Sequence, residues 1–260
     1  MKIVIPMAGI GERFIKAGYE EPKPLIKVDG KPVIEHVANI FPGEDDFVFI
    51  CREDHLETTD MYEVLRRIKP NGKIVSIKPH KLGPVWTVLE GLKKEDFIQD
   101  DQPLIVNYAD FNVWWNYEDF KKTVAEKKCN VAVTAYLGFH PHILSPSLYA
   151  SMKVNENNWM LECREKFSFT ENKMDSFQQS GTFYFSNGAL LKKYFNEVVH
   201  RQLLVNGEYY ISAVTQTIAE DNFKVYVYTL ENFLQWGTPE DLQTYQFWSD
   251  YFALKAGEKS

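Results

Sequence analysis

The chain has 260 residues, of which 45% are hydrophobic and 25% are charged, a balance typical of a globular protein with a substantial core. Its formal net charge of −7 argues against a general nucleic-acid binder, because affinity for a phosphate backbone needs a basic face. No apolar run approaches the roughly 18 residues of a membrane span. Three isolated cysteines and the lack of a secretory leader favour reduced thiols and a cytoplasmic location.

Short apolar runs alternate with longer mixed stretches through the first half of the chain. The runs are rich in Val and Ile and are predicted to be buried strands. The mixed stretches between them predict helices. This alternation indicates an α/β fold in which helices cover both faces of a parallel or mostly parallel sheet. The expected strands are residues 2–8, 45–51, 72–78, 102–110 and 130–138, and the expected helices are 31–40, 60–68, 85–92 and 117–128.

The pattern of alternating apolar and mixed stretches changes after about Gly138. Residues 149–167 predict a β-hairpin with its turn at 155–158. A strand is expected at 181–187, a helix at 188–204, one strand within 223–237 and a closing helix at 238–254. Thr238 is the expected N-cap of that last helix, with Asp241 at its third position in a near-match to the capping box. Since no linker or repeat interrupts the chain, we expect one domain over residues 1–260, whose N-terminal half binds nucleotide and whose C-terminal half binds acceptor.

The first predicted strand ends in the glycine turn Gly9-Ile10-Gly11, which Arg13 closely follows. In open α/β sheets, ligands bind beyond the carboxyl ends of strands, and glycines let backbone N–H groups approach phosphate. The dinucleotide pattern GxGxxG fails here, because Phe14 replaces its third glycine, and no GxxxxGK[ST] P-loop is present. Two glycines alone therefore leave an ordinary tight turn as an alternative.

The continuation of this turn is more specific. AGIGER at 8–13, PKPL at 22–25 and GKPVI at 30–34 follow one another in an order and spacing that resemble the nucleotidyltransferases that activate sugar phosphates. The resemblance implies a three-layer α/β/α fold with a mostly parallel central sheet. It also implies that Arg13 and Lys23 neutralise charge on the α-phosphate as it is attacked. The loop that would wrap the triphosphate consists of Met7, Ala8, Gly9, Ile10 and Gly11.

Asp110 follows the apolar run of the fourth predicted strand, where a carboxylate can hold Mg²⁺ against phosphate oxygens. A lone aspartate at such a place is otherwise an N-cap or a turn residue. The family pattern has Gly-Asp here, whereas this chain has Ala109 before the aspartate. In many relatives a second metal-binding carboxylate stands where this chain has Gln235, a neutral and weaker ligand. The resemblance therefore implies Mg²⁺ at Asp110, with Gln235 at the second position or another acid such as Glu208 contributing.

The resemblance also places the base and the acceptor. Lys78 stands where relatives have a glutamine that reads the base, five residues before Gly83. Because a lysine donates equally to a pyrimidine O2 or a purine O6, the base stays open. Glu165 and Lys166 match a Glu-Lys pair in which the lysine holds the acceptor phosphate and the glutamate a hydroxyl. Glu208 either contacts substrate or begins a helix at about residue 209. The implied acceptor-binding residues are thus Glu165, Lys166, Gly181 and Glu208.

We therefore expect a nucleotidylyltransferase that joins an NTP to a phosphorylated acceptor, above all a sugar 1-phosphate, releasing pyrophosphate. The alternatives are a glycosyltransferase of related fold that uses a nucleotide-sugar, a CTP-dependent cytidylyltransferase for a non-sugar acceptor, and a non-catalytic nucleotide-binding protein. The departures at Lys78, Ala109 and Gln235 suggest a branch that serves capsule or lipopolysaccharide precursors. The expected partners are small molecules, not nucleic acid or membrane. The oligomeric state stays open, a homo-oligomer included.

Overall fold

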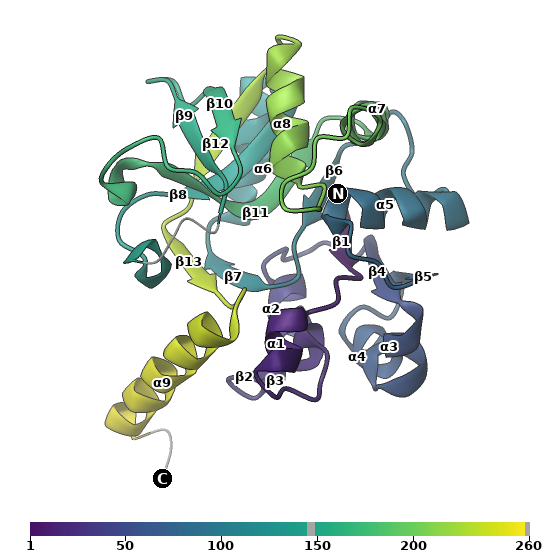
Figure 1. Ribbon diagram of the computed structural model, residues 1–260, viewed down its shortest axis with the longest axis vertical. Helices are drawn as coiled ribbons and strands as arrows, with labels where there is room; N and C mark the ends of the chain where they lie inside the picture. The colour runs from purple at the N-terminus through teal and green to yellow at the C-terminus, as the bar shows by residue number, and fades with distance from the viewer. Residues whose placement is uncertain (145–148, 258–260) are drawn as a thin grey trace.

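The computed structural model describes residues 1–144 and 149–257 (Figure 1). Within this part of the chain, nine strands form the main sheet. Its strands are β1 (Lys2–Met7), β4 (Phe47–Arg52), β5 (Lys73–Ile77), β6 (Leu104–Asn107), β8 (Val131–Tyr136), β9 (Ser151–Val154), β10 (Met160–Arg164), β11 (Phe177–Phe185) and β12 (Val225–Thr229).

The helices of the described residues lie mainly between these strands. None of them has both the length and the apolar character that crossing a membrane would require. They are α1 (Glu12–Lys16), α2 (Val33–Asn39), α3 (Glu53–Thr58), α4 (Met61–Ile68), α5 (Gly83–Lys94), α6 (Tyr117–Lys127), α7 (Gly188–His200), α8 (Ile211–Glu220) and α9 (Pro239–Ala256).

The strand order of the main sheet is β10–β9–β11–β6–β1–β4–β5, and β8 pairs with both β11 and β12. β6, β1, β4 and β5 run parallel to one another, and β12 runs parallel to β8. β11 runs antiparallel to β6, β8 and β9, and β10 runs antiparallel to β9. Most strands therefore point one way, with β11 and β10 reversed. The α/β fold with a mostly parallel central sheet is confirmed.

Both faces of the sheet are covered, because alternate residues of β1 enter different cores. Ile3 and Ile5 belong to a cluster with residues of α2, α4 and α6. Val4 belongs to a second cluster with residues of α5, α7 and α8. In a strand, successive side chains point to opposite faces, so these clusters are the two layers on either side of the sheet. The expected three-layer arrangement is confirmed (Figure 1).

Two predicted elements need correction. The helix expected from residue 31 begins at Val33, because the preceding residues form a hairpin of β2 (Lys27–Val28) and β3 (Lys31–Pro32). Asp29 and Gly30 both have positive φ, 48° and 77°, as a two-residue Asp-Gly hairpin turn requires. The single strand expected within 223–237 is two strands: β12 in the main sheet, and β13 (Asn232–Gln235), which pairs with β7 (Phe111–Trp114) in a separate sheet.

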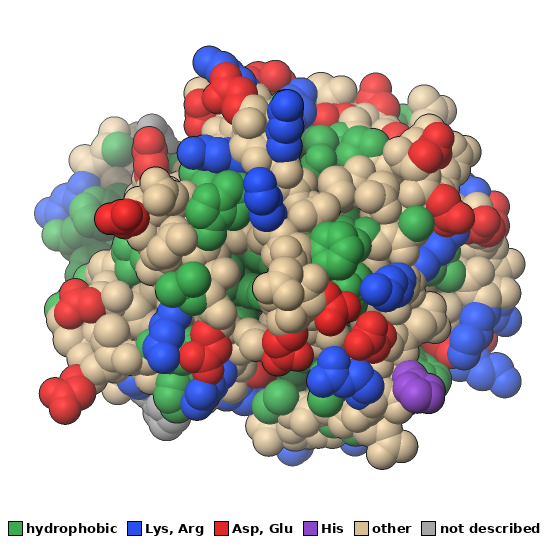
Figure 2. Space-filling model, turned by 90° about the horizontal axis from the view of Figure 1, so that it is seen from above, with side chains coloured by type: hydrophobic (Ala, Val, Ile, Leu, Met, Phe, Trp, Pro, Cys, Tyr) green, Lys and Arg blue, Asp and Glu red, His purple; other side chains and the backbone are tan. Residues whose placement is uncertain are grey.

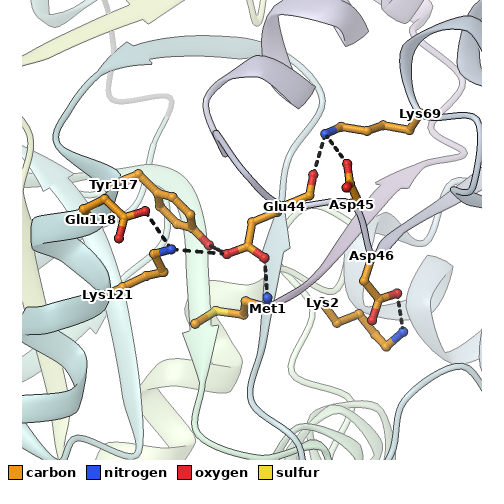
Figure 3. Close-up of polar contacts among 9 residues, drawn as sticks. All are labelled: Met1, Lys2, Glu44, Asp45, Asp46, Lys69, Tyr117, Glu118 and Lys121. Carbon is orange, nitrogen blue, oxygen red and sulfur yellow. Dashed lines mark hydrogen bonds and ion pairs between the residues drawn. The ribbon is translucent and has the colours of Figure 1, made fainter.

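The start of β1 is fixed by a buried acid in the loop before β4 (Figure 3). The amino group of Met1 pairs with one carboxylate oxygen of Glu44, which is only 8% exposed. The other oxygen accepts a hydrogen bond from the Tyr117 hydroxyl at 2.8 Å and lies 3.7 Å from Nζ of Lys121. These contacts join β1, the β4 loop and α6 at the end of the sheet opposite to the carboxyl ends.

The outer surface in Figure 2 carries acidic and basic side chains interspersed, without a continuous basic area on the face shown. This agrees with the net charge of −7. A nucleic acid would need a basic face to replace the counterions along its backbone.

Candidate active site

A cleft of about 680 Å³ opens at the carboxyl ends of β1 and β6. Parallel strands bring their carboxyl ends to one edge, which is where open α/β sheets bind ligands. Its wall combines the turn after β1, the short 3₁₀ helix η1 (Lys23–Leu25), the segment after β6, the start of α5, the loop before α8 and Gly237 after β13. The expected site residues that line it are Met7, Gly9, Ile10, Gly11, Arg13, Lys23, Gly83, Asp110 and Glu208.

The glycine turn leads directly into α1. Gly11 has φ +69°, a left-handed conformation that glycine adopts without strain, and it is the N-cap of this helix. Phe14 is 2% exposed and packs its ring against Tyr19, with a centroid distance of 5.2 Å. The residue that breaks the dinucleotide pattern is therefore a core anchor that holds the turn in place. Ala8 is buried behind the turn and is not among the residues that line the cleft.

Lys23 is the best-connected cation of the cleft. Its ammonium donates to Oδ2 of Asp110 at 2.9 Å and to the carbonyl oxygen of Gly237 at 3.0 Å. It also lies 5.1 Å from the centre of the Phe14 ring. Burial lowers the pKa of Lys23, and the Asp110 carboxylate opposes that shift. The sequence separations are 87 and 214 residues, so this contact joins three distant parts of the chain.

Arg13 reaches the same cleft from α1 and is exposed. Its guanidinium forms no hydrogen bond or ion pair with any other described residue, whereas the ammonium of Lys23 is held by Asp110 and Gly237. A guanidinium presents five donors in a rigid fork that suits phosphate. The two cations therefore differ: Lys23 is fixed before any ligand arrives, and the donors of Arg13 are available to one.

Gln235 is 4% exposed and lies behind the cleft wall, in a polar network with α9. Its Nε2 donates to Oδ2 of Asp241 and contacts the hydroxyl of Tyr149. Asp241 also accepts the Thr238 hydroxyl at 2.8 Å, and the Thr238 side chain caps α9, as the sequence predicts. Gln235 is therefore tied to α9, and its Oε1 is buried without a hydrogen-bond partner.

The cleft offers oxygen ligands of the kind that Mg²⁺ prefers. No cluster of three or more His, Cys, Asp and Glu side chains with metal-binding geometry occurs in the described residues. Mg²⁺ is, however, usually held by one or two carboxylates together with substrate phosphates and water. The Asp110 side chain is 36% exposed and lines the cleft beside Lys23, so it fits the role of a single protein carboxylate. The amide nitrogen of Gln235 faces Asp241 and Tyr149 instead.

The segment expected to read the base reaches the cleft through a residue other than Lys78. Lys78 is exposed and is not among the residues that line the cleft. His80, two residues later, lines it: its Nδ1 accepts the Leu82 N–H at 3.1 Å, and its Nε2 lies 3.1 Å from the Thr87 hydroxyl. Burial lowers the pKa of His80, so its neutral form is favoured. Because the Thr87 hydroxyl donates to the carbonyl of Gly83, the imidazole fixes the start of α5.

Gly83 has φ +84° and stands against the loop before α8. A Cβ atom at this position would lie 2.9 Å from the carbonyl oxygen of Tyr209. The Tyr209 N–H donates to Leu82 O at 2.9 Å, and the Val85 N–H donates to Tyr209 O at 3.2 Å. The glycine therefore permits a close backbone contact that brings Glu208 to the cleft. The helix expected near residue 209 is α8, which begins at Ile211.

Glu165 and Lys166, the pair expected to bind the acceptor, follow β10. The Ser212 hydroxyl donates to Oε2 of Glu165 at 2.5 Å, and burial raises the pKa of Glu165 to about 7. Lys166 has φ +53°, and its ammonium lies 5.3 Å from the ring centre of Tyr210, which itself lines the cleft. The pair therefore stands beside the cleft, one residue layer behind the lining.

Gly181 lies in β11 and is buried away from the cleft lining. Its φ is +115°, and a Cβ atom there would lie 2.8 Å from the ring of Phe111 and 3.0 Å from Tyr108. The Tyr108 N–H donates to the Gly181 carbonyl at 3.0 Å. In the structure, this glycine allows β11 to pass close to the segment that carries Asp110.

The sequence reasoning did not single out His55, His80, Thr87, Tyr108 or Tyr210, all of which line the cleft. His80 lies within the segment expected to recognise the base, so its polar side chain could have identified it as a site residue. Tyr210 and Tyr108 could have been found by their position, because each lies two residues from an expected site residue, Glu208 and Asp110 respectively. His55 comes from α3, a helix of six residues too short to give a periodic pattern, and its Nδ1 is buried without a hydrogen-bond partner.

No protein-family model matches the chain. In sequence it is similar to the UTP–glucose-1-phosphate uridylyltransferase of Haemophilus ducreyi, with 30% identity over 79 residues, which are 26% of this chain and 27% of that protein. It is also similar to the bifunctional protein GlmU of Methanocaldococcus jannaschii, with 23% identity over 86% of this chain and 48% of that protein. The matches thus span about a quarter and about half of the length of these relatives.

Solved structures extend the comparison over the whole fold. The nucleoside-diphosphate-sugar pyrophosphorylase from Vibrio cholerae RC9 has a TM-score of 0.74 at 19% identity, covering 94% of this chain and 99% of that one. The inositol-1-phosphate CTP transferase from T. maritima has a TM-score of 0.70 at 18% identity, covering 95% and 94%. The chain therefore has the fold of the sugar-phosphate nucleotidyltransferases.

Proposed function

We propose that this protein is a nucleotidylyltransferase that joins an NTP to a phosphorylated acceptor, above all a sugar 1-phosphate, and releases pyrophosphate. One observation carries the proposal: Arg13, Lys23 and Asp110, from three separate segments, meet in one cleft at the carboxyl ends of β1 and β6. Two cations and a carboxylate beside a glycine turn suit a triphosphate better than a neutral ligand.

The reaction that we propose is a direct displacement. An oxygen of the acceptor phosphate attacks the α-phosphorus, the bond from that phosphorus to the bridging oxygen breaks, and its electron pair leaves with pyrophosphate. Lys23 and Arg13 stabilise the negative charge on the α-phosphate, and the glycine turn lets backbone N–H groups approach the triphosphate. The acceptor phosphate is already ionised at neutral pH, so no general base is required.

Mg²⁺ is the cofactor that we propose, and Asp110 is the residue that would hold it. When bound, the ion would neutralise phosphate charge during transfer. The ion pair between Lys23 and Asp110 keeps the ammonium beside the carboxylate in the absence of ligand. Gln235 is neutral, and its side-chain nitrogen donates to Asp241. We therefore propose that Gln235 mainly holds α9 against the cleft wall, and that any contact with the metal is a weaker, second role.

We propose that the acceptor binds near Glu165, Lys166 and Glu208. Lys166 supplies a cation beside Tyr210 for the acceptor phosphate, and Glu165 supplies a carboxyl group for a hydroxyl. Gly181 contributes to this site indirectly, because the lack of a side chain lets β11 pass close to Tyr108, which lines the cleft. A CTP-dependent reaction on a polyol phosphate belongs in the same test, because one structural neighbour is an inositol-1-phosphate CTP transferase.

A cytoplasmic location and a supply of activated precursors for capsule or lipopolysaccharide are the finer parts of this proposal. They are supported by the chemistry of the proposed substrates and by the absence of a membrane-spanning helix among residues 1–144 and 149–257. Both follow from the reaction and stand or fall with it.

The test is a pyrophosphate-release assay with Mg²⁺, in which ATP, GTP, CTP, UTP and dTTP are each combined with a panel of sugar and polyol phosphates. We expect release that requires both substrates and that Lys23→Met lowers about 100- to 1,000-fold. Folded protein that releases no pyrophosphate with any pair would contradict the proposal. Transfer from a nucleotide-sugar without any NTP would identify the glycosyltransferase alternative instead.

A further inference from the structure

The C-terminal helix α9 projects from the body of the molecule (Figure 1). Leu242 and the Tyr245 ring, which lies 5.3 Å from the Trp236 ring, pack its first turns on the core, and polar contacts follow. Tyr245 and Ser249 donate their hydroxyls to the Asp29 carboxylate at 2.8 and 2.6 Å. Gln246 donates to the carbonyl oxygen of Lys27 at 3.0 Å. The residues that contact the β2–β3 hairpin thus recur at the three- and four-residue spacing of one helix face.

The opposite side of the helix is apolar and exposed. With about 100° between successive residues, Phe247, Tyr251 and Leu254 lie across the helix from Ser249, and Trp248 and Phe252 continue this surface toward Tyr245. Trp248 contacts three neighbouring rings at centroid distances of 5.4, 5.9 and 6.0 Å, so these aromatic side chains pack mainly on one another. We call this set the α9 aromatic face: Phe247 (65% exposed), Trp248 (51%), Tyr251 (43%), Phe252 (62%) and Leu254 (59%).

An ordinary surface helix turns its polar side to water, whereas the later turns of α9 expose aromatic side chains. The largest apolar patch on a monomer has about 300–600 Å² and is often functional. The four aromatic side chains alone expose roughly 400 Å² per copy, taking about 200 Å² for a whole aromatic side chain. A standard interface buries about 800 Å² on each partner, so the flanking side chains of α9 would need to supply the other half.

We propose that the α9 aromatic face binds the same face of a second copy, so that the protein forms a two-fold dimer through antiparallel α9 helices. A two-fold axis places one patch against itself, and an aromatic patch is self-complementary in this way. Interface cores are enriched in aromatic residues, as this face is. The dimer contact would lie on the part of α9 that the body of the molecule leaves uncovered.

The charges of the helix fit the antiparallel pairing. Glu240 lies in its first turn and Lys255 in its last turn, while Asp241 is already bonded by Gln235 and Thr238, and Asp250 lies nearer the middle of the helix. Antiparallel copies place the acidic end of one beside the basic end of the other, and also oppose their helix dipoles. The same charges disfavour an anionic membrane, because interfacial helices are rich in Lys and Arg on the polar face, whereas Lys255 is the basic residue of α9.

The mass in solution tests the proposal by light scattering after gel filtration, over a range of concentrations. Wild-type protein should reach twice the chain mass of 30.3 kDa, and Trp248→Glu/Phe252→Glu should weaken dimerisation about 100-fold or more. Leu161→Glu is the matched control, since Leu161 is 61% exposed on β10 and outside this face. It should leave the mass unchanged. Circular dichroism checks that every variant is folded.

A cysteine scan tests the orientation, and the native Cys51, Cys129 and Cys163 are buried and do not interfere. In an antiparallel pair, Trp248→Cys lies near the axis and should form an intermolecular disulfide. Lys255→Cys lies about 20 Å from its counterpart at 1.5 Å rise per residue and should not. A wild-type monomer at all concentrations, a dimer that the double variant leaves intact, or a monomer that sediments with lipid vesicles would each overturn the proposal.

Discussion

Glu165 lies in an environment that makes the stability of the fold depend on pH. Burial raises its pKa from 4.5 to about 7, while the hydrogen bond from Ser212 and the charge of Lys166 oppose the shift. The folded state therefore binds this proton more tightly than the unfolded chain does. The resulting stability is complete below about pH 4.5 and is lost as the pH rises through about 7.

The size of the effect follows from the shift. At about 1.4 kcal/mol per pKa unit, a rise from 4.5 to about 7 corresponds to about 3 kcal/mol. Glu165→Gln removes the titration and keeps the shape of the side chain. The free energy of unfolding of the wild type, minus that of the variant, should therefore fall by up to about 3 kcal/mol across this pH range.

Urea denaturation between pH 4.5 and 8 measures that difference, and subtracting the variant removes contributions from other titrating groups. Ser212→Ala is the matched comparison: it deletes the hydroxyl that donates to the carboxylate, and so should raise the pKa of Glu165 further and extend the fall to higher pH. A difference that stays constant within about 0.5 kcal/mol across the range would refute the reasoning.

Other positions give further predictions. Lys23→Met should lower kcat/KM for pyrophosphate release about 100- to 1,000-fold, as the loss of a preorganised donor does, and unchanged turnover would remove Lys23 from the mechanism. Arg13→Gln should change the free energy of unfolding by less than about 0.5 kcal/mol while turnover falls about 100-fold, a split that a structural role would not produce. Gly181→Ala should cost about 2–4 kcal/mol in urea denaturation, because its Cβ would meet the Phe111 ring. Gly9→Ala, with open space around its Cβ, should cost less than about 1 kcal/mol. Equal costs at the two glycines would contradict the packing described.

Local sequence patterns predicted the sheet and the helices that cover it. β1, β4, β5, β6 and β8 appear where apolar runs of strand length occur, and the hairpin of β9 and β10 turns at residues 155–158. Each of these elements is determined by consecutive residues, so hydrophobic periodicity and turn residues are enough to predict it. The Thr238 cap of α9 is local in the same sense.

Contacts between distant segments were beyond that reasoning. The pairing of β7 with β13 joins strands more than 100 residues apart and divides what looks like a single strand within 223–237. Lys78 and His80 are only two residues apart in the sequence. The course of the backbone after β5 determines that His80, and not Lys78, lines the cleft. Gly181 reads as a substrate residue in a motif, but the reason for a glycine there lies in Tyr108 and Phe111.

The central claim, direct transfer of a nucleotidyl group to an acceptor phosphate, is tested most directly with NTP labelled in its α-phosphate. Each NTP is incubated with the protein, Mg²⁺ and each phosphorylated acceptor, and the products and the denatured protein are separated. The account predicts label in a nucleoside-diphosphate-linked acceptor, one pyrophosphate per product, and no label on the protein. Label that stays on the protein, or that appears only as nucleoside monophosphate, would contradict it.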